Sequence, residues 1–424
     1  MSVLDELRVR GLIHDVTDAE GLGALLEAGP ITFYVGFDPT RASLHIGHFL
    51  QVMAMGWLQR AGHRAIAVVG GGTGRIGDPS GRDDERELLD EEALAANVAG
   101  LRTQLSRVLD LDGERGMLVD NWDWISQQGL VPFLRDVGKH FSVNQMIARE
   151  SVRRRLEERE HGISYTEFSY QLLQAFDFAH LNAEYGCVLQ GGGSDQWGNI
   201  TAGVDLVRRM NGVEAFGFVT PLLERSDGKK MSASSGEAVW LDPEWTSPYE
   251  FHQWFLNLPD DDVASYMKML TFLPLDDIAE VVGAAAEHPE RRDAQRRLAD
   301  EVTAIVHGPE GVERANRAAA VLFGDEPYAD LDATALADAF GTAPSVDVPP
   351  ADLAAGVGLL DLMVRAGAAS SNGEARRLVG QGGVRINNEN VADDARTVTT
   401  DDLLTGDTLV LQVGKKRHFM VRAR

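Results

Sequence analysis

The chain of 424 residues is poor in cysteine, in lysine and in long apolar runs. It has one cysteine, Cys187, and six of its 40 basic residues are lysine. A single cysteine excludes an internal disulfide framework and fits a reducing compartment. No apolar run approaches the roughly 18 residues of a membrane-spanning helix, and the N-terminal MSVLDELRVRG has no apolar core of signal-peptide length. We therefore expect a soluble, cytoplasmic protein that does not use a membrane.

Positive charge is scarce as well. The formal net charge is −25 and the pI is about 4.8. This argues against broad, non-specific binding of nucleic acid, which depends on neutralising phosphates with cations. It does not exclude a local basic patch. A hydrophobic content of 44% and a charged content of 25% are ordinary for a globular protein, and the length predicts two or three domains.

The first half of the chain alternates between strand and helix patterns. Residues 31–37 and 64–69 are rich in β-branched and apolar side chains, and an amphipathic run from Ser43 to about Ala61, closed by Gly62, lies between them. Residues 186–190 resemble a further strand. Strand, helix and strand in this order predict an α/β fold with a parallel sheet. Ligands of such sheets bind at the carboxyl ends of the strands.

The second half has a different organisation. From about 245 to 340 the pattern is helical and rich in Ala, Glu, Asp and Arg. Three prolines in 343–356 predict a linker. After it the excess of acidic residues ends, and we expect a smaller third domain.

The segment DPTRASLHIGH, residues 38–48, is the first candidate site. Ser43 can cap a helix that begins near Leu44, and His45 and His48 then share one face of its first turn. A helix N-terminus attracts anions, so these imidazoles beside Thr40 could hold phosphate oxygens. They could equally face solvent. Zinc is disfavoured because no cysteine or third histidine is near in the sequence.

Two glycine-rich segments are the next candidates. In GGGTGRIGDPSG, residues 70–81, a dinucleotide fingerprint matches, but Asp78 and Pro79 follow where a helix should begin. The glycines then serve close approach of the backbone to a ligand, with Asp78 facing a cation such as an amino group or acting only as a turn residue. In QGGGSDQWGN, residues 190–199, Asp195 could accept from hydroxyls such as a ribose, unless this is only a tight turn.

The segment SYTEFSYQLLQAFDF, residues 164–178, predicts a buried helix. Ser164 and Glu167 form a capping box. Tyr170, Gln174 and Asp177 follow at helical spacing and share one face. Polar side chains on a buried helix need partners, which a polar ligand or solvent could supply.

Together these segments resemble the bacterial tyrosyl-tRNA synthetases of class I. HIGH at 45–48 is the class signature, and KMSAS at 230–234 stands where the family carries Lys-Met-Ser-Lys-Ser. YVGFDPT, GGGTGRIGDPSG, GKHFSVN, YTEFSYQLLQAFDF and GGSDQWGNI follow in the family's order. LLDLMVRAGAASSNGEARRLVGQGGVRIN, residues 359–387, resembles the S4-type RNA-binding module.

The resemblance implies a Rossmann-like parallel-sheet catalytic domain, then an α-helical domain, then a small α+β S4-like domain. The expected boundaries are 1–225 for the catalytic domain with a dimer-interface insertion, 226–240 for the KMSKS-type loop, 241–342 for the anticodon-side helical domain, 343–356 for the linker and 357–424 for the S4-like domain. The implied activity is a tyrosine–tRNA ligase that uses ATP, with Mg²⁺ on the ATP phosphates, and tRNA-Tyr. No protein-bound structural metal is implied. The family also implies a homodimer, with GKHFSVN in the interface.

The resemblance implies a role for each site residue. Tyr34 and Asp177 would bind the phenol hydroxyl of the substrate. Its ammonium and carboxylate groups would be bound by Asp78, Tyr170, Gln174 and Gln196. ATP would contact Gly36, Asp38, Thr40, His45, His48, Gly193, Asp195, Lys229 and Lys230. RNA phosphates would contact Arg376, Arg377, Lys415, Lys416 and Arg417, for which a solvated basic face is the alternative.

One position departs from the family. Ala233 replaces the second lysine of the loop, and loss of such a charged contact costs on the order of 3 kcal/mol if nothing replaces it. We hypothesise that Lys229 compensates in part. A paralogue that binds RNA or tyrosine without efficient catalysis, a tryptophan-specific enzyme and a dehydrogenase are the alternatives.

Overall fold

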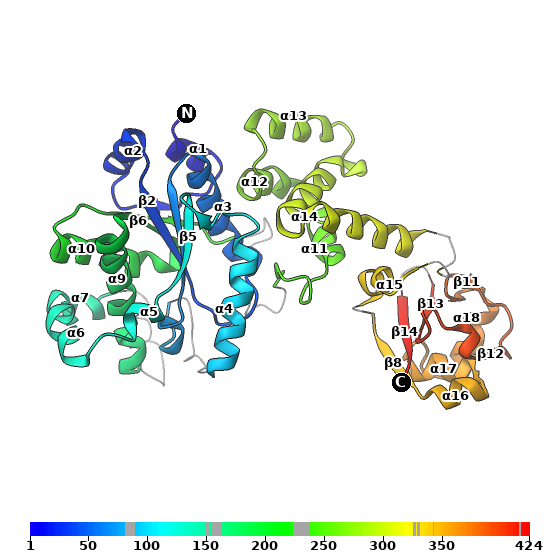
Figure 1. Cartoon of the computed structure of the whole chain (residues 1–424). Coiled ribbons are helices and arrows are strands. Elements are labelled where there is room, and N and C mark those ends of the chain that lie inside the picture. Colours follow the sequence, from blue (N-terminus) through cyan, green and yellow to red (C-terminus); the bar gives the residue numbers. More distant parts are fainter. Residues whose placement is uncertain are drawn as a thin grey trace. The chain divides into compact units, whose positions relative to one another are not determined.

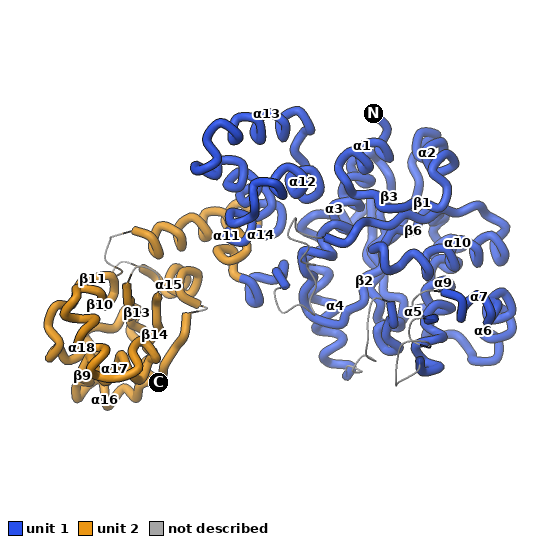
Figure 2. Tube along the Cα trace, turned by 180° about the vertical axis from the view of Figure 1, so that it is seen from behind, with its two compact units in different colours: residues 1–246, 253–307 blue, residues 247–252, 308–424 orange. Residues whose placement is uncertain are grey.

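The computed structural model describes most of the chain. The described residues are 1–80, 90–149, 152–153, 156, 163–223, 238–324, 328, 331–341, 343–414 and 417–424. They divide into two compact units (Figure 2). The first unit holds residues 1–246 and 253–307, and the second holds 247–252 and 308–424. The KMSAS segment, with Lys229, Lys230 and Ala233, lies outside the described residues, as do Lys415 and Lys416.

A seven-stranded sheet forms the centre of the first unit. Its strands are β1 (Asp15–Val16), β2 (Thr32–Phe37), β3 (Arg64–Val69), β4 (Asp112–Gly113), β5 (Gly116–Asp120), β6 (Cys187–Gly193) and β7 (Phe216–Thr220). Their order is β1-β7-β6-β2-β3-β5-β4, and the five central strands are parallel. The predicted α/β fold with a parallel sheet is therefore confirmed. The chain adds strands first on one side of β2 and later on the other, so β2 and β6 flank the topological switch point, where ligands bind in such sheets.

Helices cover both faces of this sheet (Figure 1). On one face lie α3 (Ile46–Arg60) and α4 (Glu91–Leu105), and on the other lie α9 (Tyr165–Tyr185) and α10 (Trp197–Asn211). Tyr34, Ile66 and Val68 point to the α9 face, where they pack with Ala175 and Phe178. The shorter helices of this part are α1 (Val3–Val9), α2 (Ala19–Ala28), α5 (Trp122–Ile125), α6 (Leu130–Asp136) and α7 (Val143–Ile147).

The start of α3 differs from the prediction. The helix begins at Ile46, and its N-cap is His45 rather than Ser43. The Ser43 hydroxyl is used elsewhere, because it donates to the Leu44 carbonyl and accepts from the amide of Asp242. A capping residue has extended backbone angles, and His45 has them, with φ −114° and ψ 170°. The capping box of α9 formed by Ser164 and Glu167 is confirmed.

The stretch from about 245 to 340 is helical, as predicted. It contains α11 (Pro248–Leu256), α12 (Asp260–Leu270), α13 (Leu275–Ala285), α14 (Asp293–Phe323) and α15 (Ala333–Phe340). A break interrupts α14 at Gly308, whose φ of 75° and ψ of 173° leave the helical region, and Pro309 follows. A left-handed φ of this kind favours glycine. Among the described helices, none combines the length and the apolar character that crossing a membrane requires.

A five-stranded sheet forms the core of the second unit. Its order is β11-β10-β13-β14-β8. The strands are β8 (Ser345–Val348), β10 (Val384–Ile386), β11 (Glu389–Asn390), β13 (Thr408–Val413) and β14 (Arg417–Ala423), and the helices beside them are α16 (Pro350–Ala355), α17 (Leu359–Arg365) and α18 (Asn372–Gly380). Leu362, Val379, Leu411 and Val421 share its apolar core.

The residues expected to form a linker belong to this folded unit. Strand β8 pairs in parallel with β14, and the carbonyl of Pro344 accepts from the amide of Met420. Pro349 and Pro350 stand at the N-cap and first position of α16, where a missing N–H costs no helical hydrogen bond. The prolines that suggested a linker therefore mark element boundaries.

Candidate active site

The candidate site lies at the carboxyl ends of β2, β3 and β6. Strand β2 leads to Gly36 and Asp38, strand β3 leads to the turn that contains Thr73 and Asp78, and strand β6 leads to Gln196. Segments that are far apart in the sequence therefore meet at the switch point of the sheet. The prediction of a ligand site at this edge rests on four separate motifs. Hydrogen bonds join residues of these motifs in pairs, between Asp38 and Tyr170 and between Asp78 and Gln196.

Asp38 accepts hydrogen bonds from two directions. The Thr73 hydroxyl donates to Oδ1 at 2.9 Å, and the Tyr170 hydroxyl donates to Oδ2 at 3.1 Å. The first partner comes from the turn after β3 and the second from α9. Asp38 thus links the segment that leads to HIGH, and the turn after β3, to the polar stripe of α9.

Asp177 is buried at the other end of this polar cluster. The Asn121 amide donates to Oδ2 at 2.9 Å, and the Trp124 indole donates to Oδ1 at 2.7 Å. Burial raises the pKa of Asp177 to about 8, although both hydrogen bonds oppose the shift. Asn121 also donates to the Thr73 hydroxyl at 3.0 Å. A continuous chain of hydrogen bonds therefore joins Asp177 to Asp38.

Two buried polar atoms near this chain have no partner among the described residues. They are the Tyr34 hydroxyl and the Oε1 atom of Gln174. Burial, followed by the nearby Asp177, raises the pKa of the Tyr34 phenol well above its usual value, so the hydroxyl keeps its proton. A buried polar group without a partner costs about 1–3 kcal/mol. Both atoms are therefore suited to hydrogen bonds with a polar ligand.

A second polar cluster forms where the turns after β3 and β6 meet. The Gln196 amide donates to Oδ2 of Asp78 at 2.6 Å, and the amide of Ser80 donates to Oδ1 at 3.0 Å. The Asn199 amide donates to Oε1 of Gln196 at 3.1 Å. The interpretation of Asp78 as a turn residue and the interpretation of it as a ligand group are compatible, because a carboxylate has further acceptor sites.

The two histidines of HIGH form the N-terminal cap of α3. Their rings stack with centroids 3.9 Å apart. Nδ1 of His45 accepts from the amide of Gly47 at 3.0 Å, and Nδ1 of His48 accepts from the amide of His45 at 3.3 Å. An accepting Nδ1 carries no proton, so in the neutral rings the proton is on Nε2. In each neutral imidazole Nε2–H is therefore the ring donor.

The glycines of the site have different surroundings. A side chain at Gly193 would come within 2.6 Å of Oδ1 of Asp195, so β6 passes close to that carboxylate. Gly36 is exposed, and a side chain there would meet open space. The fingerprint glycines Gly72 and Gly74 lie at a short 3-10 turn, Thr73–Arg75, and not at the start of an α-helix. This is the geometry that disfavours a dinucleotide site.

Sequence reasoning missed Thr73, Asn121 and Trp124. Asn121 and Trp124 directly follow β5, which the sequence analysis did not identify. The apolar GMLV of residues 116–119 before NWDW was the available signal. Thr73 lies among the glycines of GGGTGRIGDPSG, and its hydroxyl alone gave no signal in the sequence. Asn121 binds the backbone amide of Gly72 at 2.7 Å, so it also holds the turn after β3 in place.

The arginines expected to meet RNA lie in the second unit. Nε of Arg376 is 2.7 Å from Oδ2 of Asp394, while Nη2 of Arg377 is 3.9 Å from Oε1 of Glu374. Arg417 is the first residue of β14. Arg376 is thus engaged in an ion pair within the chain, and Arg377 is the less constrained of the two.

Comparison with protein families agrees with this arrangement. Residues 26–324 match the family described as tRNA synthetases class I (W and Y). Residues 336–421 match the Tyrosine--tRNA ligase SYY-like C-terminal domain. The fold and the site define a class I aminoacyl-tRNA synthetase.

Individual relatives narrow the class. A protein of Roseiflexus castenholzii named Tyrosine--tRNA ligase is 48% identical over 424 residues and covers 99% of both chains. One of Rhodopirellula baltica with the same name is 46% identical over 423 residues, which are 99% of this chain and 96% of that one. The solved, C-terminally truncated mitochondrial tyrosyl-tRNA synthetase of Aspergillus nidulans is 34% identical with a TM-score of 0.68, over 74% of this chain and 92% of that chain. The chain belongs to the tyrosine–tRNA ligase family.

Proposed function

We propose that this chain activates L-tyrosine with ATP to give tyrosyl-adenylate and pyrophosphate, and then transfers tyrosine to the 3′ end of tRNA-Tyr. The observation that carries the proposal is the unpartnered, buried hydroxyl of Tyr34 beside Asp177. A substrate phenol would pair with both groups. A substrate without the hydroxyl would leave the Tyr34 hydroxyl buried and without a partner among the described residues, which is costly.

The rest of the tyrosine substrate fits the two polar clusters. Its ammonium group would bind Asp78, Gln174 Oε1 and the Tyr170 oxygen, which can accept because its proton is donated to Asp38. Its carboxylate would accept from the Gln196 amide nitrogen in place of a bond that this nitrogen now donates to Asp78 or Asp195. These roles use each group in the protonation state that its present hydrogen bonds favour.

ATP would occupy the outer side of the site. Its phosphates would bind Thr40 and the Nε2–H groups of His45 and His48, near Asp38. Its ribose would contact Gly193 and the carboxylate of Asp195. The rest of the nucleotide would pass close to the backbone at Gly36. Mg²⁺ would arrive on the phosphates, because it prefers phosphate oxygens and water to dedicated protein cages. Lys229 and Lys230, outside the described residues, would face the pyrophosphate.

The first chemical step needs no nucleophile from the protein. An oxygen of the tyrosine carboxylate, ionised at neutral pH, forms a bond to the α-phosphorus of ATP. The bond from that phosphorus to the bridging oxygen breaks, and pyrophosphate leaves with its electron pair. In the second step a hydroxyl of the terminal adenosine of tRNA attacks the carbonyl carbon, and AMP leaves. Catalysis then consists of positioning and stabilisation of charge on the leaving oxygens.

We also propose that the protein acts in the cytoplasm as a homodimer. Exposed apolar side chains on α6, α7 and the end of α10 support an interface near GKHFSVN: Leu130, Val131, Leu134, Val143, Ile147, Met210 and Val213. Arg209 of α10 donates to the carbonyl of His140, which ties these segments together. In the proposed division of labour, residues 1–225 catalyse, 241–342 face the anticodon side, and 357–424 bind RNA.

The test is tyrosine-dependent ATP–pyrophosphate exchange on the purified chain, with phenylalanine and tryptophan as controls. Exchange with tyrosine alone is the expected result. Exchange with tryptophan would reassign the pocket, and the absence of exchange with all three in folded protein would favour a binding paralogue. Aminoacylation of tRNA-Tyr then tests the second step.

A further inference from the structure

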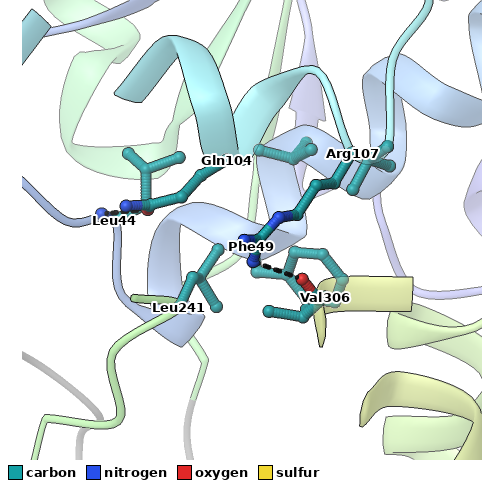
Figure 3. A pocket seen from close by; sticks show the side chains of 8 residues that line it. Leu44, Phe49, Gln104, Arg107, Leu241 and Val306 are labelled. Carbon is teal, nitrogen blue, oxygen red and sulfur yellow. Dashed lines mark hydrogen bonds between the residues drawn. The ribbon is translucent and has the colours of Figure 1, made fainter. Parts of the chain in front are cut away.

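Gln104, near the C-terminal end of α4, holds the backbone that leads into HIGH. Its side chain is 6% exposed. Oε1 accepts from the amide of Leu44 at 2.8 Å, and Nε2 donates to the carbonyl of Ala42 at 3.1 Å. Figure 3 shows Gln104 reaching from α4 to Leu44 across a small pocket. These two backbone groups lie just before the N-cap of α3, so one amide side chain satisfies both.

A second segment is fastened to the same place. The amide of Ile46 donates to the carbonyl of Val239 at 2.9 Å, and the amide of Leu241 donates to the carbonyl of Leu44 at 2.9 Å. The Ser43 hydroxyl accepts from the amide of Asp242 at 3.1 Å, and Nε2 of Gln104 is 3.5 Å from Oδ2 of Asp242. The segment 239–242 thus runs antiparallel to 44–46, with His45 opposite Trp240.

The end of α4 is itself braced within the first unit. Nη1 of Arg107 donates to the carbonyl of Val306 at 2.8 Å, just before the break of α14 at Gly308 (Figure 3). Within α4, a side chain added at Gly100 would collide with the carbonyl of Ala42. Helix α4 therefore packs closely against the backbone of the loop that contains Ala42. The end of α4 that carries Gln104 is held in place by these contacts.

We propose that Gln104 is a positioning residue for the ATP step. By fixing Ala42 and Leu44 it sets where α3 begins, and this sets where Nε2 of His45 and His48 lie. The inference rests on the proposed function, because it assumes that these imidazoles meet phosphate oxygens. Misplacement of a catalytic group by about 1 Å can cost on the order of a hundredfold in rate.

Gln59 offers a matched control. It is also a buried glutamine, 4% exposed. Its Nε2 donates to the carbonyls of Asp110 and Arg115 at 2.8 and 3.0 Å, and its Oε1 accepts from the amide of Asp110 at 2.9 Å. The Gln59 side chain thus has three hydrogen bonds, against four for Gln104, two of which are 3.5 Å long. Those of Gln59 hold the loop before β5, at the opposite end of α3 from HIGH. If replacement of Gln104 affected only stability, its effect on kcat should equal that of replacing Gln59.

The experiment compares Gln104→Met with Gln59→Met in the full chain. Thermal unfolding and ATP–pyrophosphate exchange are measured, with kcat and the KM values for tyrosine and ATP determined separately. We expect Gln104→Met to lower kcat about ten- to a hundredfold, with the KM for tyrosine within about twofold of the parent. Gln59→Met should lower the unfolding temperature similarly and leave kcat within about twofold.

A second variant tests the same proposal if Gln104→Met does not fold. Gly100→Ala removes no polar group but displaces Ala42, so it should lower kcat with the KM for tyrosine unchanged. Unchanged kcat in both Gln104→Met and Gly100→Ala, or an equal loss of kcat in Gln59→Met, would overturn the positioning role. Failure of the proposed function would be visible earlier, as absence of tyrosine-dependent exchange in the parent chain.

Discussion

The two ends of the candidate active site differ in burial and in the hydrogen-bonding groups that they present. At the inner end, Tyr34 and Asp177 are 2% and 3% exposed, and Asn121 and Trp124 donate to the carboxyl group of Asp177. At the outer end, Thr40, His45 and His48 are half-buried, and Gly36 is exposed. Desolvation makes an unpaired group costly at the inner end, which suits discrimination between substrates. The outer end presents donors at a helix N-terminus, which suits an oxyanion that forms and leaves.

The largest effect is expected at the outer end. His45→Asn should lower kcat for pyrophosphate exchange by about 10²–10³, the usual cost of removing one donor to a developing oxyanion. The KM for tyrosine should stay near that of the parent. Asparagine is chosen because it is a good N-cap, whereas alanine would also remove the cap of α3. If His45→Asn instead raised the KM for tyrosine, the assignment of tyrosine to the inner end and ATP to the outer end would be wrong.

A smaller loss, of the opposite kind, is expected at the inner end. Asp177→Asn should lower kcat/KM for tyrosine by about ten- to a hundredfold, since leaving a buried hydrogen-bonding group of the site unpaired costs about 1–3 kcal/mol. Asn121 and Trp124 both donate to Asp177, so an amide there leaves one donor without an acceptor. The KM for ATP should change little. Equal damage to the KM values for tyrosine and ATP would contradict this separation.

The inner end should also be visible in the pH dependence of stability. The pKa of Asp177 is about 8 in the folded chain against 3.8 as its ordinary value. Between these values the unfolded chain has lost this proton and the folded chain keeps it, so this group lowers the free energy of unfolding as pH rises from about 4 to about 8. Asp177→Asn removes the effect.

Thermal unfolding at pH 5 and pH 8 tests this expectation. The unfolding temperature of Asp177→Asn minus that of the parent should be more positive at pH 8 than at pH 5 by several degrees, because the pKa difference corresponds to roughly 3–4 kcal/mol across this window. A difference that is the same at both pH values would mean that the carboxyl does not titrate in this window.

The smallest effect is expected outside both ends. Arg377→Ala should weaken tRNA binding about threefold and reduce the salt slope of binding by about one. Arg376→Ala serves as the comparison and should do less, because Arg376 is bound closely to Asp394. Pyrophosphate exchange needs no tRNA and should be unchanged in both. Loss of exchange would show that the second unit affects the catalytic site.

Local patterns predicted most of the elements because their physics is local. Runs of β-branched and apolar side chains identified β2 and β3, a capping box identified the start of α9, and glycines marked the turns after β3 and β6. Errors arose where a residue had a more favourable partner from elsewhere. Ser43 was expected to cap α3, but its hydroxyl is engaged with Leu44 and Asp242. The prolines on either side of β8 suggested a linker because the pairing of β8 with the distant β14 leaves no local signal.

The candidate site divides in the same way. The sequence identified Tyr34, Asp177, His45 and His48 as candidates by residue type, spacing and resemblance to a family. It could not identify the hydrogen bonds of Asn121 and Trp124 to Asp177, or the hold of Gln104 on the loop before HIGH.

The sequence by itself determined the order of the elements, the membership of the family and the residue types at the pocket. The tertiary structure alone decided which polar groups are buried, which of them are paired, and hence which carboxyl keeps its proton. Periodicity and caps depend on neighbours within a few residues, whereas burial and pairing depend on segments that meet only when β2, β3, β5 and β6 lie side by side.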